Sequence, residues 1–315
     1  MTHSDSAAAT AEDSPGRSPL SDGLVPGRRW TPTRLLGRIT DVVSGDLLVA
    51  VGAAILGLVI LIALTAPWVA PDAAQGRGTA DVANRDLAPS TAHLFGTDHL
   101  GRDIVSRVMF GTRPALAVSF VVVFAAILIG VAIGSVAGYL GGWVDEVLMR
   151  ITDVFLSFPP LLLTMIIASL LGPSLVHAAI ALVVSWWPWY ARLVRTVAQS
   201  IRQRSYIEAA RISGAPVYRI LRRHVLRNSW SPVFVQAAID FGTVILAAGS
   251  LAFLGLGAQP PTADWGLMVA DGRTTVTSEW WIPTFPGLAI FVVVLGANLL
   301  GDGMQNLLKP GSGRR

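Results

Sequence analysis

The stretch LLVAVGAAILGLVILIALTAPWV, residues 47–69, decides the fold class, because none of its side chains is charged. A helix rises 1.5 Å per residue, so about 20 apolar residues cross a bilayer. Five further apolar stretches occur at residues 116–140, 155–171, 175–190, 232–254 and 285–300. The 315-residue chain is only 14% charged, whereas soluble domains carry about 25% charged residues. These features predict an all-α, polytopic membrane protein with six transmembrane helices.

The basic residues predict the orientation of the chain. With the amino terminus inside, 18 of the 24 Lys and Arg lie inside and six lie outside, and cytoplasmic segments normally carry this excess. All ten Trp fall at or beyond the ends of the predicted spans, at the headgroup level that Trp prefers. We therefore expect a multi-pass membrane protein with both termini in the cytoplasm, and we attribute its basic pI to this topology.

The rest of the chain divides around these spans. Residues 1–42 are rich in small, polar and Pro residues without an apolar period, which predicts a disordered cytoplasmic tail. We expect the first transmembrane helix at 43–70, an extracytoplasmic loop at 71–115 and a core of five further helices at 116–310. Residues 311–315 would form a second cytoplasmic tail, and a second extracytoplasmic piece is expected at about 259–282.

The sequence lacks the residues that several classes of enzyme and metal-binding protein need. The chain has no Cys, which excludes Cys nucleophiles and Cys-bound zinc. Its one lysine, Lys309, does not follow a glycine-rich turn, so a Walker phosphate loop is absent. No two of the five His have ligand spacing, and no H-E-x-x-H occurs. We expect no catalytic residue, no bound cofactor, no metal and no nucleic-acid partner.

A polar segment interrupts the apolar pattern at residues 202–228, RQRSYIEAARISGAPVYRILRRHVLRN. Residues 206–212 are predicted to form one helix, and Gly214 predicts a break after it. Residues 216–228 are predicted to form a second helix that begins at Pro216. The second helix has one apolar face, formed by Val217, Ile220, Leu221, His224 and Val225, and Arg residues on its other side. It could lie on anionic lipid, but the helix–Gly–helix form favours docking to a protein partner.

The residues Glu208, Ala209 and Ala210, followed after three residues by Gly214, resemble the EAA motif of permease subunits of ABC importers. Four other segments, in order, are similar to dipeptide and oligopeptide permeases of the C type: FGTDHLGRDIVSRVMFGTRPAL from residue 95, VDEVLMRITDVFLSFP from 144, LAFLGLGAQPPTADWG from 251 and NLLGDGMQNLLKP from 298. One departure is Arg227, which follows Leu226 where the family has a proline.

The resemblance implies a type I ABC importer permease in the bacterial plasma membrane. Its elbow would dock into a cleft of the ATPase subunit through Tyr206, Glu208, Ala209, Ala210, Arg211, Gly214, Ala215, His224 and Leu226. The implied partners are a homologous second permease, two ABC ATPases that bind ATP and magnesium, an extracytoplasmic substrate-binding protein and a peptide substrate. Nickel and glutathione importers share this permease type and stay open as alternatives, as does a stand-alone secondary transporter.

Polar residues in or near the spans give further candidates. Asp240, with Gln236 and Asn298, could line the translocation path, or Asp240 could instead pack against the partner permease. The residues Asp98, Arg102, Asp103, Asp264 and Trp265 are candidates for contact with the binding protein. For Asp98, Arg102 and Asp103, the alternative is a set of internal salt bridges that orders the loop. Near the inner interface, Asp153 is expected to pair with Arg150.

Overall fold

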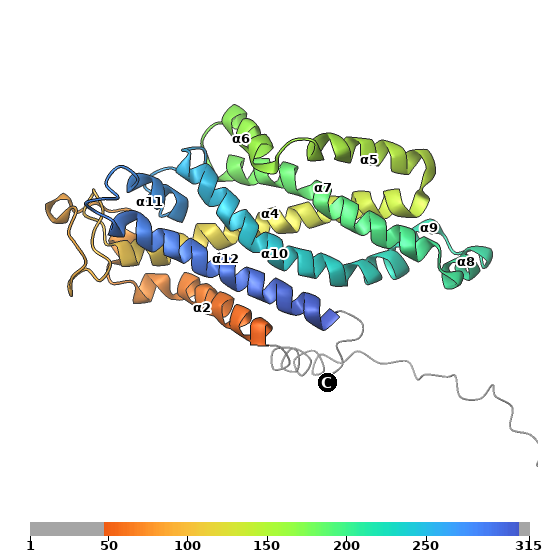
Figure 1. Ribbon diagram of the computed structural model, residues 1–315, viewed down its shortest axis with the longest axis horizontal. Helices are drawn as coiled ribbons and strands as arrows, with labels where there is room; N and C mark the ends of the chain where they lie inside the picture. Colours follow the sequence, from red (N-terminus) through yellow and green to blue (C-terminus); the bar gives the residue numbers. More distant parts are fainter. Residues whose placement is uncertain (1–46, 309–315) are drawn as a thin grey trace, which may run out of the picture. The chain divides into compact units, whose positions relative to one another are not determined.

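The computed structural model describes residues 47–308, and the regular secondary structure in that range is helical (Figure 1). The elements are α2 (Leu47–Val69), α3 (Ala73–Gly76), η1 (Val82–Asn84), α4 (Ile104–Leu140), α5 (Gly142–Leu156), α6 (Pro160–Leu171), α7 (Leu175–Arg202), α8 (Ser205–Ile212), α9 (Val217–Ile220), the π-helical turn η2 (Leu221–Val225), α10 (Leu226–Phe253), α11 (Trp265–Asp271) and α12 (Trp281–Leu308). The all-α prediction is confirmed. The predicted tails, residues 1–42 and 311–315, lie outside the described residues.

Four helices in the described range are each long and apolar enough to cross a membrane. They are α2, α4, the continuous helix Val217–Phe253 and α12, here counted over Trp281–Asn306. Helices α5 and α6 pass the same test only as a pair, bent by 83° at the break between them. The span predicted at residues 155–171 is therefore not one continuous helix, since it includes the end of α5, the break and α6. The cause is the pair Pro159 and Pro160, because a proline disfavours helical geometry in the residue before it and lacks the N–H that would continue the ladder.

Helix α7 contains the remaining predicted span, residues 175–190. It is 28 residues long, but it continues past the apolar stretch through Arg192, Arg195 and Arg202 and is not among the helices apolar enough to count as a span. The predicted number of six spans is therefore not fully confirmed.

Glycines let the long helices approach closely. Gly130, Gly134 and Gly138 lie at four-residue spacing on α4, and a Cβ added at any of them would come within 3.0 Å of the backbone of α7. Gly52 of α2 is equally close to the backbone of α12 at Leu300. Such small-residue contacts are typical of helices packed in membranes, where van der Waals contact holds helices together.

Salt bridges join α5 to α7. Asp145 accepts two hydrogen bonds from Arg195, at 2.6 and 2.7 Å, and Asp153 accepts one from Arg192 at 2.6 Å. The expected pairing of Asp153 with Arg150 is therefore wrong, because α7 brings a better placed guanidinium from a distant part of the sequence. Arg150 instead faces Glu146 at 3.8 Å.

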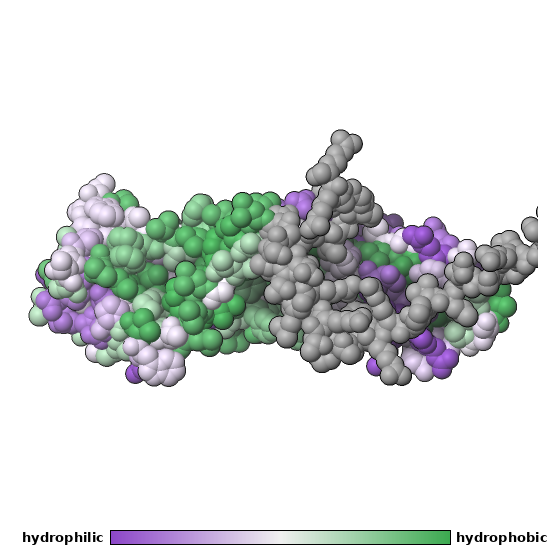
Figure 2. Space-filling view, turned by 90° about the horizontal axis from the view of Figure 1, so that it is seen from below, coloured by the Kyte–Doolittle hydropathy of each residue, from purple (hydrophilic) through white to green (hydrophobic). Residues whose placement is uncertain are grey.

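Most of the connections lie at two opposite ends of the helices, whereas the turn between α5 and α6 lies between them (Figure 1). We call residues 70–103 and 254–280 the loop end, and residues 205–225 the elbow. The two parts of the loop end contact each other, since His99 lies 3.3 Å from the Asp271 carbonyl, and the Trp281 indole at the start of α12 donates to the Thr97 carbonyl at 3.2 Å. Helix α4 begins at Ile104, so it includes the end of the loop predicted at 71–115. Figure 2 shows hydrophobic residues between the two ends and hydrophilic residues at both.

Candidate functional site

The elbow is a short helix followed by a turn and a long helix. α8 ends where the Gly214 amide donates to the Arg211 carbonyl at 2.9 Å and the Ala215 amide donates to the Ala210 carbonyl at 3.0 Å. Gly214 has φ +77, a conformation that L side chains rarely adopt, and no atom lies within 4 Å of where its Cβ would be. The sequence predictions of a helix, a break at Gly214 and a second helix are confirmed.

One side of the elbow is fixed to α4 and α7. Ile207, Ile220 and Val225 are fully or almost fully buried and pack with side chains that end those two helices, among them Tyr139. Each such aliphatic side chain stabilises the packed state by about 1.5–3 kcal/mol relative to exposure. Arg211 adds a polar contact, because its Nε donates to the Tyr139 hydroxyl at 3.1 Å and its guanidinium lies 5.0 Å from the ring centre. The elbow is therefore held firmly by the spans.

The other side of the elbow exposes an unusual amount of apolar surface. Ile212 is 83% exposed, Tyr218 65% and Tyr206 49%. Glu208, next to them, is exposed and forms no ion pair with any residue in 47–308. Apolar patches rimmed by polar groups mark surfaces that another molecule covers. Of the predicted docking residues, the exposed ones are Tyr206, Glu208, Ala209, Arg211 and Gly214, and the half-buried ones are Ala210, Ala215, His224 and Leu226.

The structure changes two details of this surface. Val217 was expected on the buried apolar face but is 45% exposed, because it lies in the first turn beside Pro216. Ile212 and Tyr218 belong to the exposed surface, although the sequence analysis did not select them. The signal was available, since each is a large apolar or aromatic residue next to the break at Gly214.

The arginines lie on the predicted opposite face. Arg219, Arg222, Arg223 and Arg227, together with Tyr218, line a groove of about 470 Å³. Arg227 stands where the related pattern has a proline, and the helix is continuous here from Val217 to Phe253.

The predicted path residues lie on two helices, Gln236 and Asp240 on α10 and Asn298 on α12. Asp240 is 7% exposed, and its Oδ1 accepts a hydrogen bond from Gln236 at 3.1 Å. Its Oδ2 is buried and forms no hydrogen bond within the part of the chain that the structure describes, and Tyr190 and Trp186 of α7 face this carboxyl group. Asn298 is half-buried. The burial of Asp240 within its own chain favours a packing role, and a role in the path stays a prediction.

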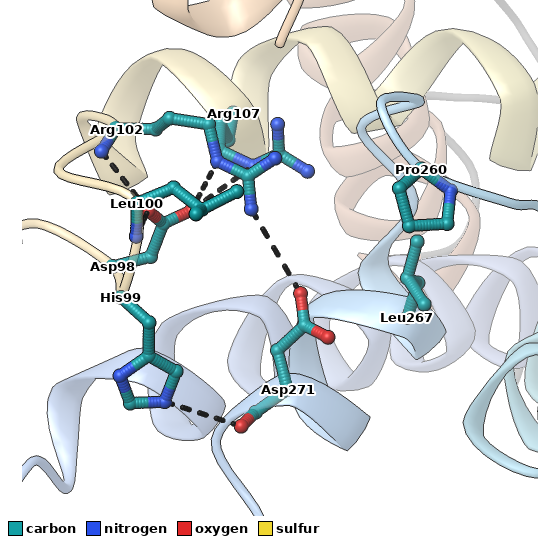
Figure 3. Close-up of a pocket in the computed structure, with 8 residues that line it drawn as sticks. All are labelled: Asp98, His99, Leu100, Arg102, Arg107, Pro260, Leu267 and Asp271. Atoms are coloured by element: carbon teal, nitrogen blue, oxygen red, sulfur yellow. Dashed lines mark hydrogen bonds and ion pairs between the residues drawn. The ribbon is translucent and has the colours of Figure 1, made fainter. Parts of the chain in front are cut away.

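The predicted binding-protein contacts at the loop end are buried. Asp98 Oδ2 accepts from Arg102 Nε at 2.7 Å and lies 3.6 Å from Arg107 Nε, and Arg102 reaches Asp271 at 3.9 Å (Figure 3). These groups line a pocket of about 200 Å³. Burial raises the pKa of Asp271, although the two guanidinium groups oppose this shift.

The other residues of this set bond within the chain as well. Asp103 caps α4 by accepting from the Ser106 amide at 2.8 Å, and Asp264 caps α11 by accepting from the Leu267 amide at 3.1 Å. Burial raises the pKa of Asp264. The Trp265 indole donates to the Val108 carbonyl at 2.9 Å. The structure thus favours salt bridges and caps that order the loop, and contact with a binding protein stays a prediction.

Comparison with known proteins places the chain among transport proteins. Residues 130–314 match the family described as "Binding-protein-dependent transport system inner membrane component". The chain is 43% identical over 295 residues to the "Probable D,D-dipeptide transport system permease protein DdpC" of Escherichia coli (strain K12), covering 93% of this chain and 98% of that protein. It is 39% identical over 256 residues to the "Nickel transport system permease protein NikC" of the same strain, covering 81% of this chain and 91% of that protein.

A solved structure is similar in fold. It is an inward-facing form of the MetNI methionine ABC transporter, which matches with a TM-score of 0.51 and 20% sequence identity over 64% of this chain and 96% of that one. At this identity the likeness concerns the fold alone. The family match and the relatives carry the assignment, and the chain belongs to the inner membrane components of binding-protein-dependent transport systems.

Proposed function

We propose that the chain is the transmembrane permease subunit of an ATP-driven importer for dipeptides or oligopeptides. The observation that carries this proposal is the elbow. One side is buried against α4 and α7, and the other exposes Tyr206, Ile212 and Tyr218 around the acidic Glu208. A surface with this composition on a firmly held segment is suited to receive force from a partner. We therefore assign the exposed side to docking of an ATPase subunit.

The mechanism follows from how the elbow is attached. Two ATPase subunits would bind ATP and magnesium, and this chain would supply no catalytic site of its own. When the ATPases close, the elbow moves with them. Its contact with Tyr139 and its continuity with α10 pass that movement to the spans. A homologous second permease would complete the path, which opens alternately to either side as the spans tilt.

The proposed orientation puts the elbow and both termini in the cytoplasm. The arginine-rich groove beside the elbow supports this, because basic residues accumulate on the cytoplasmic side. The loop end would then face outward, where a substrate-binding protein delivers its cargo. The plasma membrane of a bacterium is the setting that this arrangement requires.

Peptide is the proposed substrate, with nickel and glutathione as alternatives. The D,D-dipeptide relative is slightly more similar than the nickel relative, at 43% against 39% identity. Within residues 47–308, the group of three side chains that could bind a metal ion, Asp86, His99 and Glu279, lies at the loop end and not along the spans. This distribution supports a peptide cargo, since a path for metal ions would offer ligands within the membrane.

The test is purification of the tagged chain from its native membrane in mild detergent, with sequencing of the proteins that accompany it. We expect a second permease and ATPases carrying Walker motifs. Ile212→Asp should reduce capture of the ATPases, because it places a charge in the apolar docking face. Val276→Asp is the matched control, since Val276 is an exposed apolar residue of the loop end, at 51% exposure.

The assembled complex in vesicles would then be assayed for uptake of a labelled dipeptide, glutathione and nickel. Active transport by the chain alone would refute the proposal of an ATP-driven subunit. Equal capture of the ATPases by the wild type and the Ile212→Asp variant would refute the docking surface. Uptake of nickel or glutathione in place of dipeptide would correct only the substrate.

A further inference from the structure

Three side chains from distant parts of the sequence meet at the loop end. Asp86 follows η1, His99 lies in the turn before α4, and Glu279 lies shortly before α12. The His99 Nδ1 atom is 2.7 Å from Asp86 Oδ1 and 3.7 Å from Glu279 Oε2. One ligand atom from each of the three lies within 4.8 Å of the others.

Hydrogen bonding within the chain leaves this group incomplete. A proton on Nδ1 can bond to one carboxylate oxygen only, and Asp86 is the nearer acceptor. Glu279 Oε2 is then buried without a hydrogen-bond partner among residues 47–308. A buried oxygen left unpaired costs free energy, so such groups are rare and point to something that completes them.

The other nitrogen of the imidazole faces a backbone carbonyl. His99 Nε2 lies 3.3 Å from the Asp271 carbonyl oxygen, which Figure 3 shows beside the pocket. That carbonyl can only accept, so Nε2 carries a proton, and a bound cation would take the place of the Nδ1 proton between the ring and the two carboxylates. Metal-binding histidines have this arrangement, because a carbonyl fixes the ring and the free nitrogen binds the ion.

We propose that Asp86, His99 and Glu279 bind a divalent cation of the zinc type. One imidazole nitrogen and two carboxylates form a three-ligand set that leaves a fourth position open to water. Ligand atoms around tetrahedral zinc are roughly 3.3 Å apart, given bonds of about 2.0–2.1 Å. The two separations from His99 Nδ1, 2.7 and 3.7 Å, lie on either side of that value, and all three ligand atoms lie within 4.8 Å of one another, so side-chain shifts alone would bring them around one ion.

The inferred cation would link segments that are far apart in the sequence. It would join the loop before α4 to the segment before α12, at the end of the molecule where we place the binding protein. The site does not depend on the proposed substrate, since it lies outside the spans. The sequence analysis missed it because no two of the three residues are close enough in sequence to show ligand spacing.

The experiment uses the full chain, purified through a tag without histidines, reconstituted in nanodiscs and stripped with EDTA. Titration with zinc chloride at pH 7.5 is followed by calorimetry, and cobalt chloride is used in parallel for its visible absorption. We expect one zinc ion per chain, a cobalt spectrum of low coordination number and a higher unfolding temperature with zinc. His99→Ala should weaken zinc binding at least tenfold.

Two further variants keep the result decisive. Glu279→Gln retains the shape of the side chain and removes its charge, so it should weaken binding even if His99→Ala fails to fold. His177→Ala is the matched control, because His177 is also half-buried but bonds to the Gly172 carbonyl with no carboxylate beside it. Absence of saturable binding, or equal binding by wild type and Glu279→Gln, would overturn the proposal.

Discussion

The backbone at Gly214 gives a direct test of the elbow. Its φ of +77 costs an L residue about 1–2 kcal/mol, and a β-branched residue more. Since no atom lies within 4 Å of the position of the missing Cβ, a substitution is opposed by the backbone and not by a clash within the chain. Gly214→Val should therefore distort the turn, whereas Gly214→Asn should retain it because Asn tolerates this conformation. A cost of 1–2 kcal/mol corresponds to roughly a 5- to 30-fold loss of the docking-competent form.

The assay is the ratio of peptide uptake to ATP hydrolysis in vesicles that contain the assembled transporter. We expect Gly214→Val to insert normally and to lower this ratio, and Gly214→Asn to stay close to the wild type. Gly255→Val is the matched control, because Gly255 has φ +79 and equally open surroundings but lies at the loop end. Unchanged coupling in Gly214→Val would refute the role of the elbow. Equal damage by Asn and Val would show that open space at Gly214 matters, and would refute the backbone argument.

Further predictions concern the packing of the spans. Gly134→Ala should destabilise the protein by about 1–3 kcal/mol, because the added Cβ would meet the backbone of α7. Gly57→Ala is the control and should not destabilise it, because the space around Gly57 is open. Thermal unfolding followed by Trp fluorescence measures both variants. Asp145→Asn should lower stability by about 1 kcal/mol in the same measurement by weakening the bond from α5 to α7, and Glu146→Gln, whose ion pair is highly exposed, should change nothing measurable. Asp240→Asn should leave peptide uptake within about twofold of wild type if Asp240 has a packing role. A large loss of uptake with normal assembly would instead support a role of Asp240 in the translocation path.

The sequence was most informative where one local rule dominated. Apolar length predicted a span over the residues that form α2, and Gly214 with Pro216 marked the break in the elbow. The arginine face of the second helix also followed from spacing alone. In each case the deciding residues are neighbours along the chain, so no knowledge of tertiary contacts was needed.

Prediction failed where the deciding contact was distant in sequence. Asp153 pairs with Arg192 and not with the nearby Arg150, and no residue close to Asp153 in the sequence indicates this pairing. For the loop-end charges the sequence left two alternatives open, contact with a binding protein or salt bridges that order the loop, and it could not show that Arg107 is 1% exposed and Asp98 7% exposed at its side chain. The bend between α5 and α6 has a local cause, because Pro159 and Pro160 are adjacent in the sequence. It was missed because the apolar pattern was given more weight than these two prolines.

Because the elbow continues directly into α10, the displacement at the elbow and the displacement at the loop end are linked by a fixed ratio. The helix Val217–Phe253 has 37 residues and is therefore about 55 Å long. Its close contact with α12 at Gly242 divides it into unequal arms of about 38 and 17 Å. If the helix rocks about that contact, a displacement at the elbow is reduced to less than half at the loop end and reversed in direction. A large stroke by an ATPase would thus become a short, opposite and correspondingly stronger stroke at the far side of the membrane.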